Sequence, residues 1–363
     1  MNNNTVPEAL ESELHDLQVA ATERSLGSEG ASLQIVTDSG QLKVDVVLGF
    51  PGGSAAPELT SQIQAVLDRA GVTESTISVE SRIASHSVAH GLQPLPGVKN
   101  IIAVASGKGG VGKSTVAVNL AAACAAEGAT VGLLDADIYG PSQPTMLGLE
   151  GARPDSADGK TMEPLSAHGI QAMSIGFLVD DRQPMAWRGP MVTSALTQLL
   201  NQTNWHELDY LFVDMPPGTG DIQLTLAQRV PVSGCVIVTT PQNVALADAR
   251  KALEMFQKVN VPVLGVIENM SSHVCSQCGH EESLFGSAGG SALAAEYGIP
   301  LLGQMPLELA VREAADSGTP AVVLEPDSLA AQRYRAAAVR VAGELAATGR
   351  DYSHLFPKIT VEE

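Results

Sequence analysis

The sequence has few cysteines, few aromatic residues and few basic residues for its length. Four cysteines scattered over 363 residues are too few for a disulfide framework. No apolar run approaches the roughly 18 residues of a membrane-spanning helix, and the first residues lack the basic and apolar regions of an export signal. We therefore expect a soluble, cytoplasmic protein whose core needs no disulfides.

The charge balance narrows the choice of partners. Lys and Arg number 21 against 40 Asp and Glu, which gives a formal net charge of −19. A field of this sign repels nucleic acid and anionic membranes, so we expect neither as a partner. The hydrophobic fraction of 44% excludes a wholly disordered chain.

The chain changes in texture near residue 90. Residues 1–85 combine two alternating, strand-like segments with helical spacing at 58–71, which predicts a small α+β N-terminal domain. Residues 86–98 are rich in Ser, His, Gly and Pro and predict a linker, in which His86 and His90 are exposed to solvent.

Residues 99–363 alternate short apolar segments with helical patterns. This alternation predicts an α/β fold with a mainly parallel sheet covered by helices on both faces. Ligands of such sheets lie at the carboxyl ends of the strands, so the residues that follow each strand are the candidates for chemistry. The expected helices span 113–127, 191–202 and 244–259.

A glycine-rich segment follows the first of these strands. It satisfies G-x-x-x-x-G-K-[ST] between an expected strand and an expected helix, which is the pattern of a phosphate-binding loop. Its backbone N–H groups suit phosphate oxygens, Lys113 suits the β- and γ-phosphates, and the Ser114 hydroxyl suits Mg²⁺. The alternative is a turn that merely caps a helix. The predicted nucleotide-binding residues are Gly107, Lys108, Gly109, Gly110, Val111, Gly112, Lys113, Ser114 and Thr115.

Carboxylates follow two further strands. Asp135 and Asp137 end one of them, and Asp214 ends another. Near a phosphate-binding loop, one carboxylate can hold Mg²⁺ or its water while another orients the attacking water. A single Asp after a strand is otherwise a helix cap or a turn residue. We interpret the group as part of a Mg²⁺–nucleotide site.

Two of the four cysteines form a C-x-x-C pair. Cys275 and Cys278 place two sulfurs on one tight loop, as ligands of an iron–sulfur cluster would be placed. A [4Fe–4S] cluster takes four thiolates, which a symmetric dimer would supply. The pattern also allows a zinc site with His273 and His280, a redox pair, or a purely structural role. Cys124 and Cys235 lie in apolar segments and are expected to be buried and inert.

Several motifs together carry a family resemblance. GKGGVGKST, DADIYGPS and DMPPGTGD resemble the deviant Walker A ATPases, the group of MinD and the nitrogenase iron protein. WRGPM, ENMS, CSQCG and LFGSAGG follow in the order seen in the Mrp/ApbC family, and the similarity runs from about residue 99 to 345. The resemblance implies an ATP-dependent carrier that binds a [4Fe–4S] cluster across a homodimer, through Cys275 and Cys278, and transfers it to apo iron–sulfur proteins.

The same resemblance assigns roles to single residues. It implies that Lys108 reaches the nucleotide of the partner subunit, that Lys113 and Asp137 act in hydrolysis, and that Asp214 lies near Mg²⁺ with Ser114. Asn269 would contact the adenine base. Trp187 and Arg188 are interpreted as structural or linked to a nucleotide-sensing segment.

The N-terminal domain departs from the family pattern in one respect. It lacks the cysteine common in the small domain of this family, so docking or stability is a more plausible role for it than cluster handling.

A rival function is a MinD- or ParA-like positioning ATPase. Such a protein would need a basic amphipathic tail or a DNA-binding surface, which the acidic, Pro357-containing C-terminal segment and the net charge disfavour.

Overall fold

The computed structural model describes residues 8–20, 22–28, 30–38, 41–88, 91–179, 189–275 and 277–349. His90, Trp187 and Arg188 lie outside the described residues, so their predicted roles stay predictions. Within the described part, no helix is both long and apolar enough to cross a membrane.

A large, mainly parallel sheet forms the centre of the molecule, as the alternation of segments predicts. Its neighbours follow the order β14–β12–β11–β6–β10–β7–β9–β8, and only β8 and the short β13, which pairs with β12, run antiparallel to their neighbours. The central strands are buried along nearly their whole length, which explains their continuous apolar sequences. The strands are β6 (Val98–Ala105), β7 (Val131–Asp135), β8 (Leu165–Ala167), β9 (Ile170–Ser174), β10 (Leu208–Asp214), β11 (Gly234–Thr239), β12 (Val263–Val274), β13 (Glu281–Glu282) and β14 (Leu301–Leu307).

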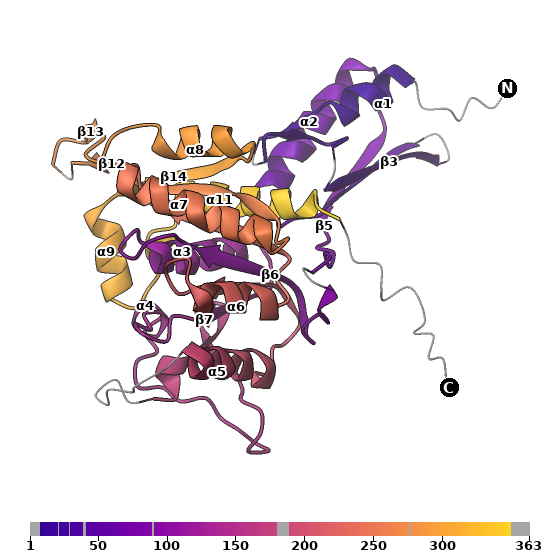
Figure 1. Ribbon diagram of the computed structural model, residues 1–363. Coiled ribbons are helices and arrows are strands. Elements are labelled where there is room, and N and C mark those ends of the chain that lie inside the picture. Colours follow the sequence, from indigo (N-terminus) through magenta and orange to yellow (C-terminus); the bar gives the residue numbers. More distant parts are fainter. Residues whose placement is uncertain are drawn as a thin grey trace.

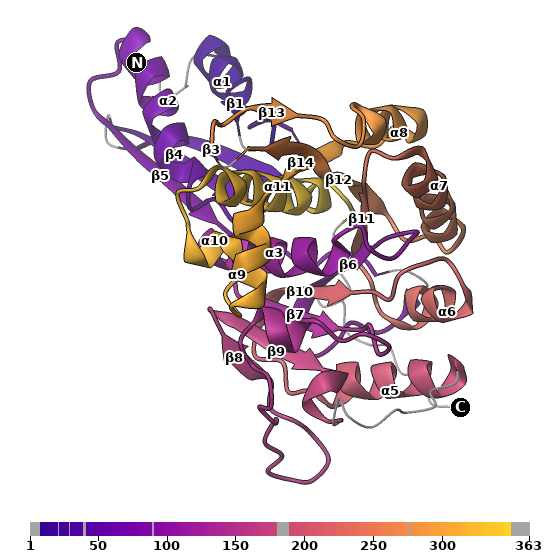
Figure 2. The same cartoon turned by 90° about the vertical axis from the view of Figure 1, so that its left-hand side faces the viewer.

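Helices cover both faces of this sheet (Figure 2). One layer is built around α3 and α11, with α10 against both, α4 against α3, and α9 against α4 and α10; the other is the row α5, α6, α7 and α8. The three helices expected from the sequence are confirmed as α3, α5 and α7. The bounds are α3 (Lys113–Ala126), α4 (Gln143–Met146), α5 (Gly189–Gln202), α6 (Asp221–Arg229), α7 (Asn243–Lys258), α8 (Gly289–Tyr297), α9 (Leu309–Asp316), α10 (Ala321–Leu324) and α11 (Leu329–Ala346).

The N-terminal segment forms a separate, smaller sheet at one end of the molecule (Figure 1). Strands β3 and β4 pair antiparallel, and α2 crosses over to a parallel β5. The segment is tied to the larger unit by an ion pair between Arg24 and Glu344 at 2.7 Å and by the Ser54 N–H, which donates to the Glu127 carboxylate at 2.7 Å. Its elements are α1 (Glu8–His15), β1 (Gln18–Val19), β2 (Arg24–Ser25), β3 (Ala31–Asp38), β4 (Gln41–Leu48), α2 (Ala55–Arg69) and β5 (Ser75–Ser81).

The start of the predicted linker packs against the large sheet. The expectation that His86 is solvated is wrong, because its side chain is only 2% exposed. Its ring Nδ1 and its backbone N–H both lie at hydrogen-bonding distance from the Asn100 side-chain oxygen, at 2.9 and 3.0 Å. A buried asparagine on β6 therefore fixes the start of the predicted linker.

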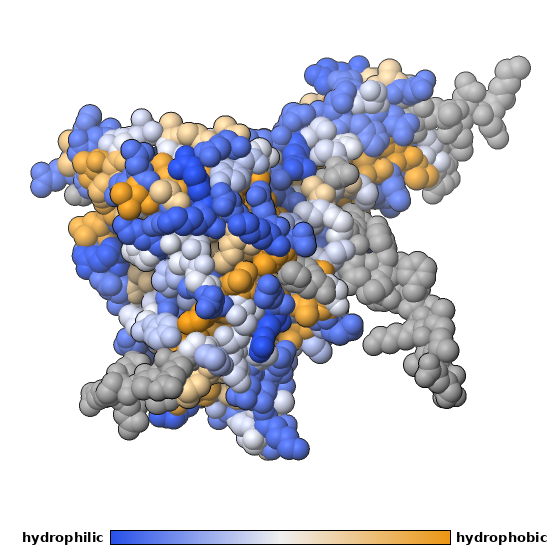
Figure 3. All heavy atoms as spheres, viewed as in Figure 1, coloured by the Kyte–Doolittle hydropathy of each residue, from blue (hydrophilic) through white to orange (hydrophobic). Residues whose placement is uncertain are grey.

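Apolar side chains are exposed where the parallel strands end. Tyr139 follows β7, Met191 lies in the first turn of α5, Val244 in the first turn of α7, and Leu284 beyond β13, and all four are more than half exposed. Figure 3 shows apolar residues among polar ones at the left of the view, the side to which the β12–β13 turn belongs. This side also carries the candidate site.

Candidate functional site

The loop between β6 and α3 has a backbone that suits phosphate. Gly110 and Gly112 have φ angles of +82° and +79°, a region that glycine enters without strain. Lys113 begins α3, so the first N–H groups of the helix have no partner within the helix itself. Such a loop followed by a helix N-terminus fits phosphate oxygens.

Two glycines of this loop are also required by close packing. A Cβ on Gly112 would lie 2.2 Å from the Asn269 side-chain nitrogen, and a Cβ on Gly107 would lie 2.0 Å from the Asp248 carbonyl oxygen. Both distances are far below van der Waals contact. The sequence pattern therefore reflects the packing of the loop against β12 and α7 as well as its backbone conformation.

Lys113 and Asp214 form a buried ion pair beneath the loop. Lys113 is 6% exposed and Asp214 is fully buried, and the lysine Nζ donates to the carboxylate. The same Nζ lies 3.3 Å from the Ser114 hydroxyl. The structure thus brings together the lysine, the hydroxyl and one carboxylate that the sequence assigned to a Mg²⁺–nucleotide site.

Gln143 completes this group and was missed by the sequence analysis. Its side-chain amide donates to the second oxygen of Asp214 at 2.9 Å and to the Ser114 carbonyl at 3.1 Å. It begins α4, directly after the DADIYGPS motif that carries the resemblance. Because the amide links the end of β10 to the start of α3, it holds Asp214 beside the loop.

Asp135 and Asp137 have different environments. Asp135 is fully buried and accepts from the backbone N–H groups of Asp137, Ser142 and Gln143 at 3.0–3.1 Å and from the Ser174 hydroxyl at 3.2 Å. Burial, followed by the nearby charge of Asp214, raises the pKa of Asp135, and the backbone donors oppose this shift. Four donors make Asp135 an anchor for the segment that follows β7.

Asp137 is more accessible than its neighbour. Its side chain is half-buried, and partial burial raises its pKa while the charge of Lys113 lowers it. The charge of Lys113 thus acts on Asp137 as well as on Asp214, and the partial exposure of Asp137 suits the predicted role of orienting water. That role stays a prediction.

Lys108 projects from the loop. It is exposed, and among the described residues its ammonium has no hydrogen-bond or ion-pair partner. It borders a cavity of about 320 Å³, together with Gly109, Gly110, Val111, Thr240, Gln242, Val244, Ala245 and Met270.

Asn269 lies under the loop and is bonded to it. It is 6% exposed, and its amide donates to the Val111 carbonyl at 2.9 Å. The predicted contact with the base stays a prediction, but the NH₂ group of this residue already binds the phosphate loop. The preceding Glu268, which the sequence analysis also missed, is fully buried and accepts from the Gly290 N–H at the start of α8 and from Gln304.

Cys275 and Cys278 lie in the turn between β12 and β13, not at the start of a helix. The turn is closed by the Cys275 N–H, which donates to the His280 carbonyl, and the Gly279 N–H, which donates to the Cys275 carbonyl, both at 2.9 Å. Cys275 is partly exposed and Cys278 exposed. The backbone N–H groups of Gln277 and Cys278, followed by the Cys278 side chain, lower the pKa of the Cys275 thiol.

The other candidate ligands are placed differently. The His273 ring bonds to the Leu307 carbonyl at 3.1 Å. Across the described ranges, no three His, Cys, Asp or Glu side chains gather closely enough to hold a metal ion. Cys124 and Cys235 are buried as expected, and burial raises the pKa of both thiols.

A phosphate-binding loop between a buried parallel strand and a helix, with its lysine paired to an aspartate at the end of the adjacent strand, defines the class of P-loop NTPases. Comparison with known proteins assigns the chain to one family within this class. Residues 97–342 match the ParA family described as "NUBPL iron-transfer P-loop NTPase", about two thirds of the chain, and the chain belongs to this family.

Individual relatives agree with this assignment. The chain is 58% identical over 270 residues to an iron-sulfur cluster carrier protein of Pseudomonas fragi, a match that covers 74% of this chain and 94% of the relative. It is 55% identical over 305 residues to the protein of that name from Escherichia coli K12, covering 84% and 83%. Among solved structures, the nucleotide-binding protein in complex with ADP from Archaeoglobus fulgidus is 38% identical, with a TM-score of 0.57 over 64% of this chain and 90% of that one. The Mrp/ApbC resemblance and the P-loop α/β fold predicted from the sequence are confirmed.

Proposed function

We propose that this protein is an ATP-dependent iron–sulfur cluster carrier that works in the cytoplasm as a homodimer. It binds a [4Fe–4S] cluster as cargo between two copies of the Cys275/Cys278 turn and passes the cluster to apo iron–sulfur proteins. The observation that carries the proposal is the pair of accessible thiols on one turn, in a chain that also has a P-loop. The names of the relatives from Pseudomonas fragi and Escherichia coli support it.

The chemistry of the turn suits a transient iron ligand. Thiolate is the form that binds iron, and the backbone N–H groups near Cys275 favour its thiolate. Exposure lets an acceptor approach the sulfurs directly. Both properties fit a site that must release its cargo, whereas a permanent metal site is usually closed.

The number of thiols favours a second copy of the chain. A [4Fe–4S] cluster takes four cysteine ligands, and each chain offers two at this turn. Apolar side chains are exposed after β7, in the first turns of α5 and α7 and after β13, and a second copy packed on them would bury them; they are Tyr139, Met191, Val244 and Leu284. Lys108 is free to reach a nucleotide across such an interface.

The loop residues fit MgATP. Gly107 to Thr115 would hold the phosphates, Lys113 would contact the β- and γ-phosphates, and Ser114 with Asp214 would bind Mg²⁺ or its waters. The metal, when bound, neutralises charge on the phosphate oxygens. Asp137 is the accessible carboxylate that would orient the attacking water, and Asn269 would lie near the base.

The experiment is anaerobic reconstitution of the purified protein with iron and sulfide. We expect about four irons and four sulfides per dimer, and loss of both in the Cys275→Ala/Cys278→Ala variant. Cys124→Ala, which removes a buried thiol, is the matched control and should retain the cluster. Zinc bound without sulfide, or a cluster retained in the double variant, would refute the proposal.

A further inference from the structure

A single strand joins the phosphate-binding loop to the cysteine turn. Strand β12 runs from Val263 to Val274, and Cys275 follows it directly. Asn269 lies in the middle of this strand and bonds to the Val111 carbonyl of the loop at 2.9 Å. Six positions along the chain therefore separate Asn269, which contacts the loop, from the Cys275 thiol.

Asn269 bonds to the Val111–Gly112 peptide unit, whose N–H group is expected to bind phosphate. The Val111 carbonyl and the Gly112 N–H belong to one planar peptide unit, so they cannot rotate independently. The N–H side of such a unit in a P-loop faces phosphate, and here its C=O side accepts from Asn269. A phosphate that turns this peptide unit consequently moves the acceptor of Asn269.

The strand beyond Asn269 is irregular, so its backbone can shift when the loop moves. Met270 has a φ of +54°, an uncommon value for a residue with a side chain, and it borders the same cavity as Lys108. The pairing of β12 with β14 changes register between Asn269 and His273. Two bonds hold this part of the strand to β14: one runs from the Ser271 hydroxyl to the Met305 carbonyl, and one joins the His273 ring to the Leu307 carbonyl.

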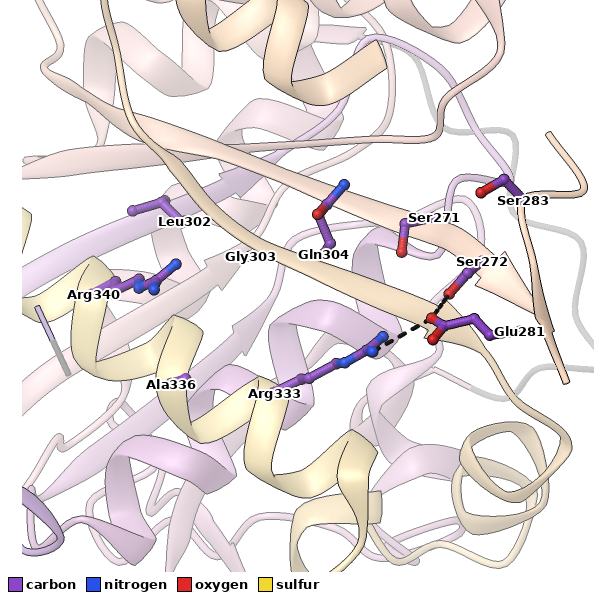
Figure 4. A pocket seen from close by; sticks show the side chains of 10 residues that line it. All are labelled: Ser271, Ser272, Glu281, Ser283, Leu302, Gly303, Gln304, Arg333, Ala336 and Arg340. Atoms are coloured by element: carbon purple, nitrogen blue, oxygen red, sulfur yellow. Dashed lines mark hydrogen bonds and ion pairs between the residues drawn. The ribbon is translucent and has the colours of Figure 1, made fainter. Parts of the chain in front are cut away.

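The cysteine turn is held at its base by one small cluster (Figure 4). The Glu281 carboxylate accepts from the Ser272 hydroxyl and lies 3.4 Å from the Arg333 guanidinium of α11. A cavity of about 440 Å³ lies beside this cluster and is bordered by Gln304, Ala336 and Arg340 as well. Because Ser272 belongs to β12 and Glu281 to β13, a shift of β12 reaches both sides of the turn.

We propose that Asn269 is a positioning residue that transmits phosphate binding at the loop to Cys275 through β12, and that Glu281 holds the turn in register with the strand. The inference rests on the nucleotide binding proposed above. It assigns to Asn269 a role distinct from contact with a base. It also explains why the buried amide of this residue donates to the backbone of the loop. The reactivity of the cysteine thiols then depends on whether the loop holds phosphate.

The test uses the apoprotein, so it is independent of cluster binding. The rate at which 5,5′-dithiobis(2-nitrobenzoate) modifies the accessible thiols is measured with and without Mg²⁺ and the ATP analogue AMP-PNP, whose binding is measured separately. We expect the analogue to change the wild-type rate several-fold and to leave the rate of Asn269→Ala within about 1.5-fold of its nucleotide-free value. Asn201→Ala, an exposed asparagine on α5, is the matched control and should keep the wild-type response.

A second pair of variants tests the other end of the strand. Glu281→Gln should weaken the nucleotide response, whereas Glu282→Gln removes the same charge from the same strand without touching Ser272 or Arg333 and should keep it. This pair decides the matter if Asn269→Ala fails to fold or to bind AMP-PNP. An unchanged wild-type rate upon binding, or a full response in either Asn269→Ala or Glu281→Gln, would overturn the inference. Failure of the wild type to bind AMP-PNP would instead contradict the proposed function.

Discussion

The ammonium of Lys113 and the carboxylate of Asp214 form an ion pair at the centre of the candidate site, with both groups almost completely shielded from solvent. Asp214 ends β10, and Lys113 begins the helix that follows β6, the strand beside it. Gln143 occupies the other carboxylate oxygen. The lysine predicted to contact phosphate is thus held by the carboxylate predicted to bind Mg²⁺, so the binding of MgATP proposed above requires this pair to rearrange.

Lys113→Ala should lower both nucleotide affinity and stability. The lost contact between ammonium and phosphate should cost about 1.5–3 kcal/mol of binding, which is roughly a tenfold to hundredfold loss of affinity. Asp214 would remain buried without its partner, which should lower the free energy of unfolding by about 3 kcal/mol. Calorimetric titration with ATP and urea denaturation measure the two effects.

The control for this prediction is Lys251→Ala. Lys251 pairs with Asp248 on the surface, and its side chain is 65% exposed. Its removal should change stability by no more than about 0.5 kcal/mol and leave ATP affinity intact. Wild-type affinity in Lys113→Ala would remove this lysine from the nucleotide site.

The layout of the large sheet could be predicted from the sequence because its strands are buried on both faces. Such strands are continuously apolar, and the helices between them keep their own period, so both elements are recognisable. His86 could not be placed in this way. Its burial depends on Asn100, a polar residue inside β6, and pattern analysis gives no means of pairing two isolated polar residues.

Some residues of the candidate site could be predicted from the sequence and others could not. Short local motifs point to the P-loop, Asp214 and the cysteine pair as candidates. Gln143 and Glu268 act through contacts with β10, α3 and α8, which only the folded chain brings near. The ENMS motif points to Asn269, but its bond to Val111 depends on how closely β12 packs under the loop.

Gly112→Ala should destabilise the nucleotide-free protein more than Gly128→Ala does. Both glycines have positive φ angles, +79° and +98°, so both substitutions introduce backbone strain of about 1–2 kcal/mol. Only at Gly112 would the new Cβ also meet a neighbour, the Asn269 amide at 2.2 Å, whereas Gly128 has open space. We expect Gly112→Ala to cost at least about 1 kcal/mol more in urea denaturation.

A double variant separates the clash from other effects. Asn269→Ala removes the amide that the new Cβ would strike, so the cost of Gly112→Ala should be smaller in that background than in the wild type. Equal costs in both backgrounds would show that the loop and β12 do not pack as described.

Asn100→Ala should weaken the connection between the two sheets. The Asn100 side chain is 1% exposed, accepts from His86 and donates to the carbonyls of Ala84 and Asp209 at 2.8 and 3.2 Å. Leaving these buried groups without their common partner should lower the free energy of unfolding by about 2–3 kcal/mol. Asn201→Ala, at an exposed position of α5, should change it by less than about 0.5 kcal/mol. Equal effects of the two substitutions would contradict the role given to Asn100.

The pH at which the alkylation rate of Cys275 is half its maximum should be lower than that of an ordinary thiol. Thiolate is the reactive form, and the N–H groups of Gln277 and Cys278 stabilise it, which lowers the pKa of Cys275. Reactivity should therefore be complete above this lowered pKa and be lost as the pH falls through it. The measurement is the rate of iodoacetamide labelling against pH in Cys278→Ser, which keeps a hydroxyl donor beside Cys275, with N-acetylcysteine amide as the reference thiol. A midpoint at or above that of the reference would mean that the turn does not favour the thiolate, and it would withdraw the electrostatic argument for iron binding at this position.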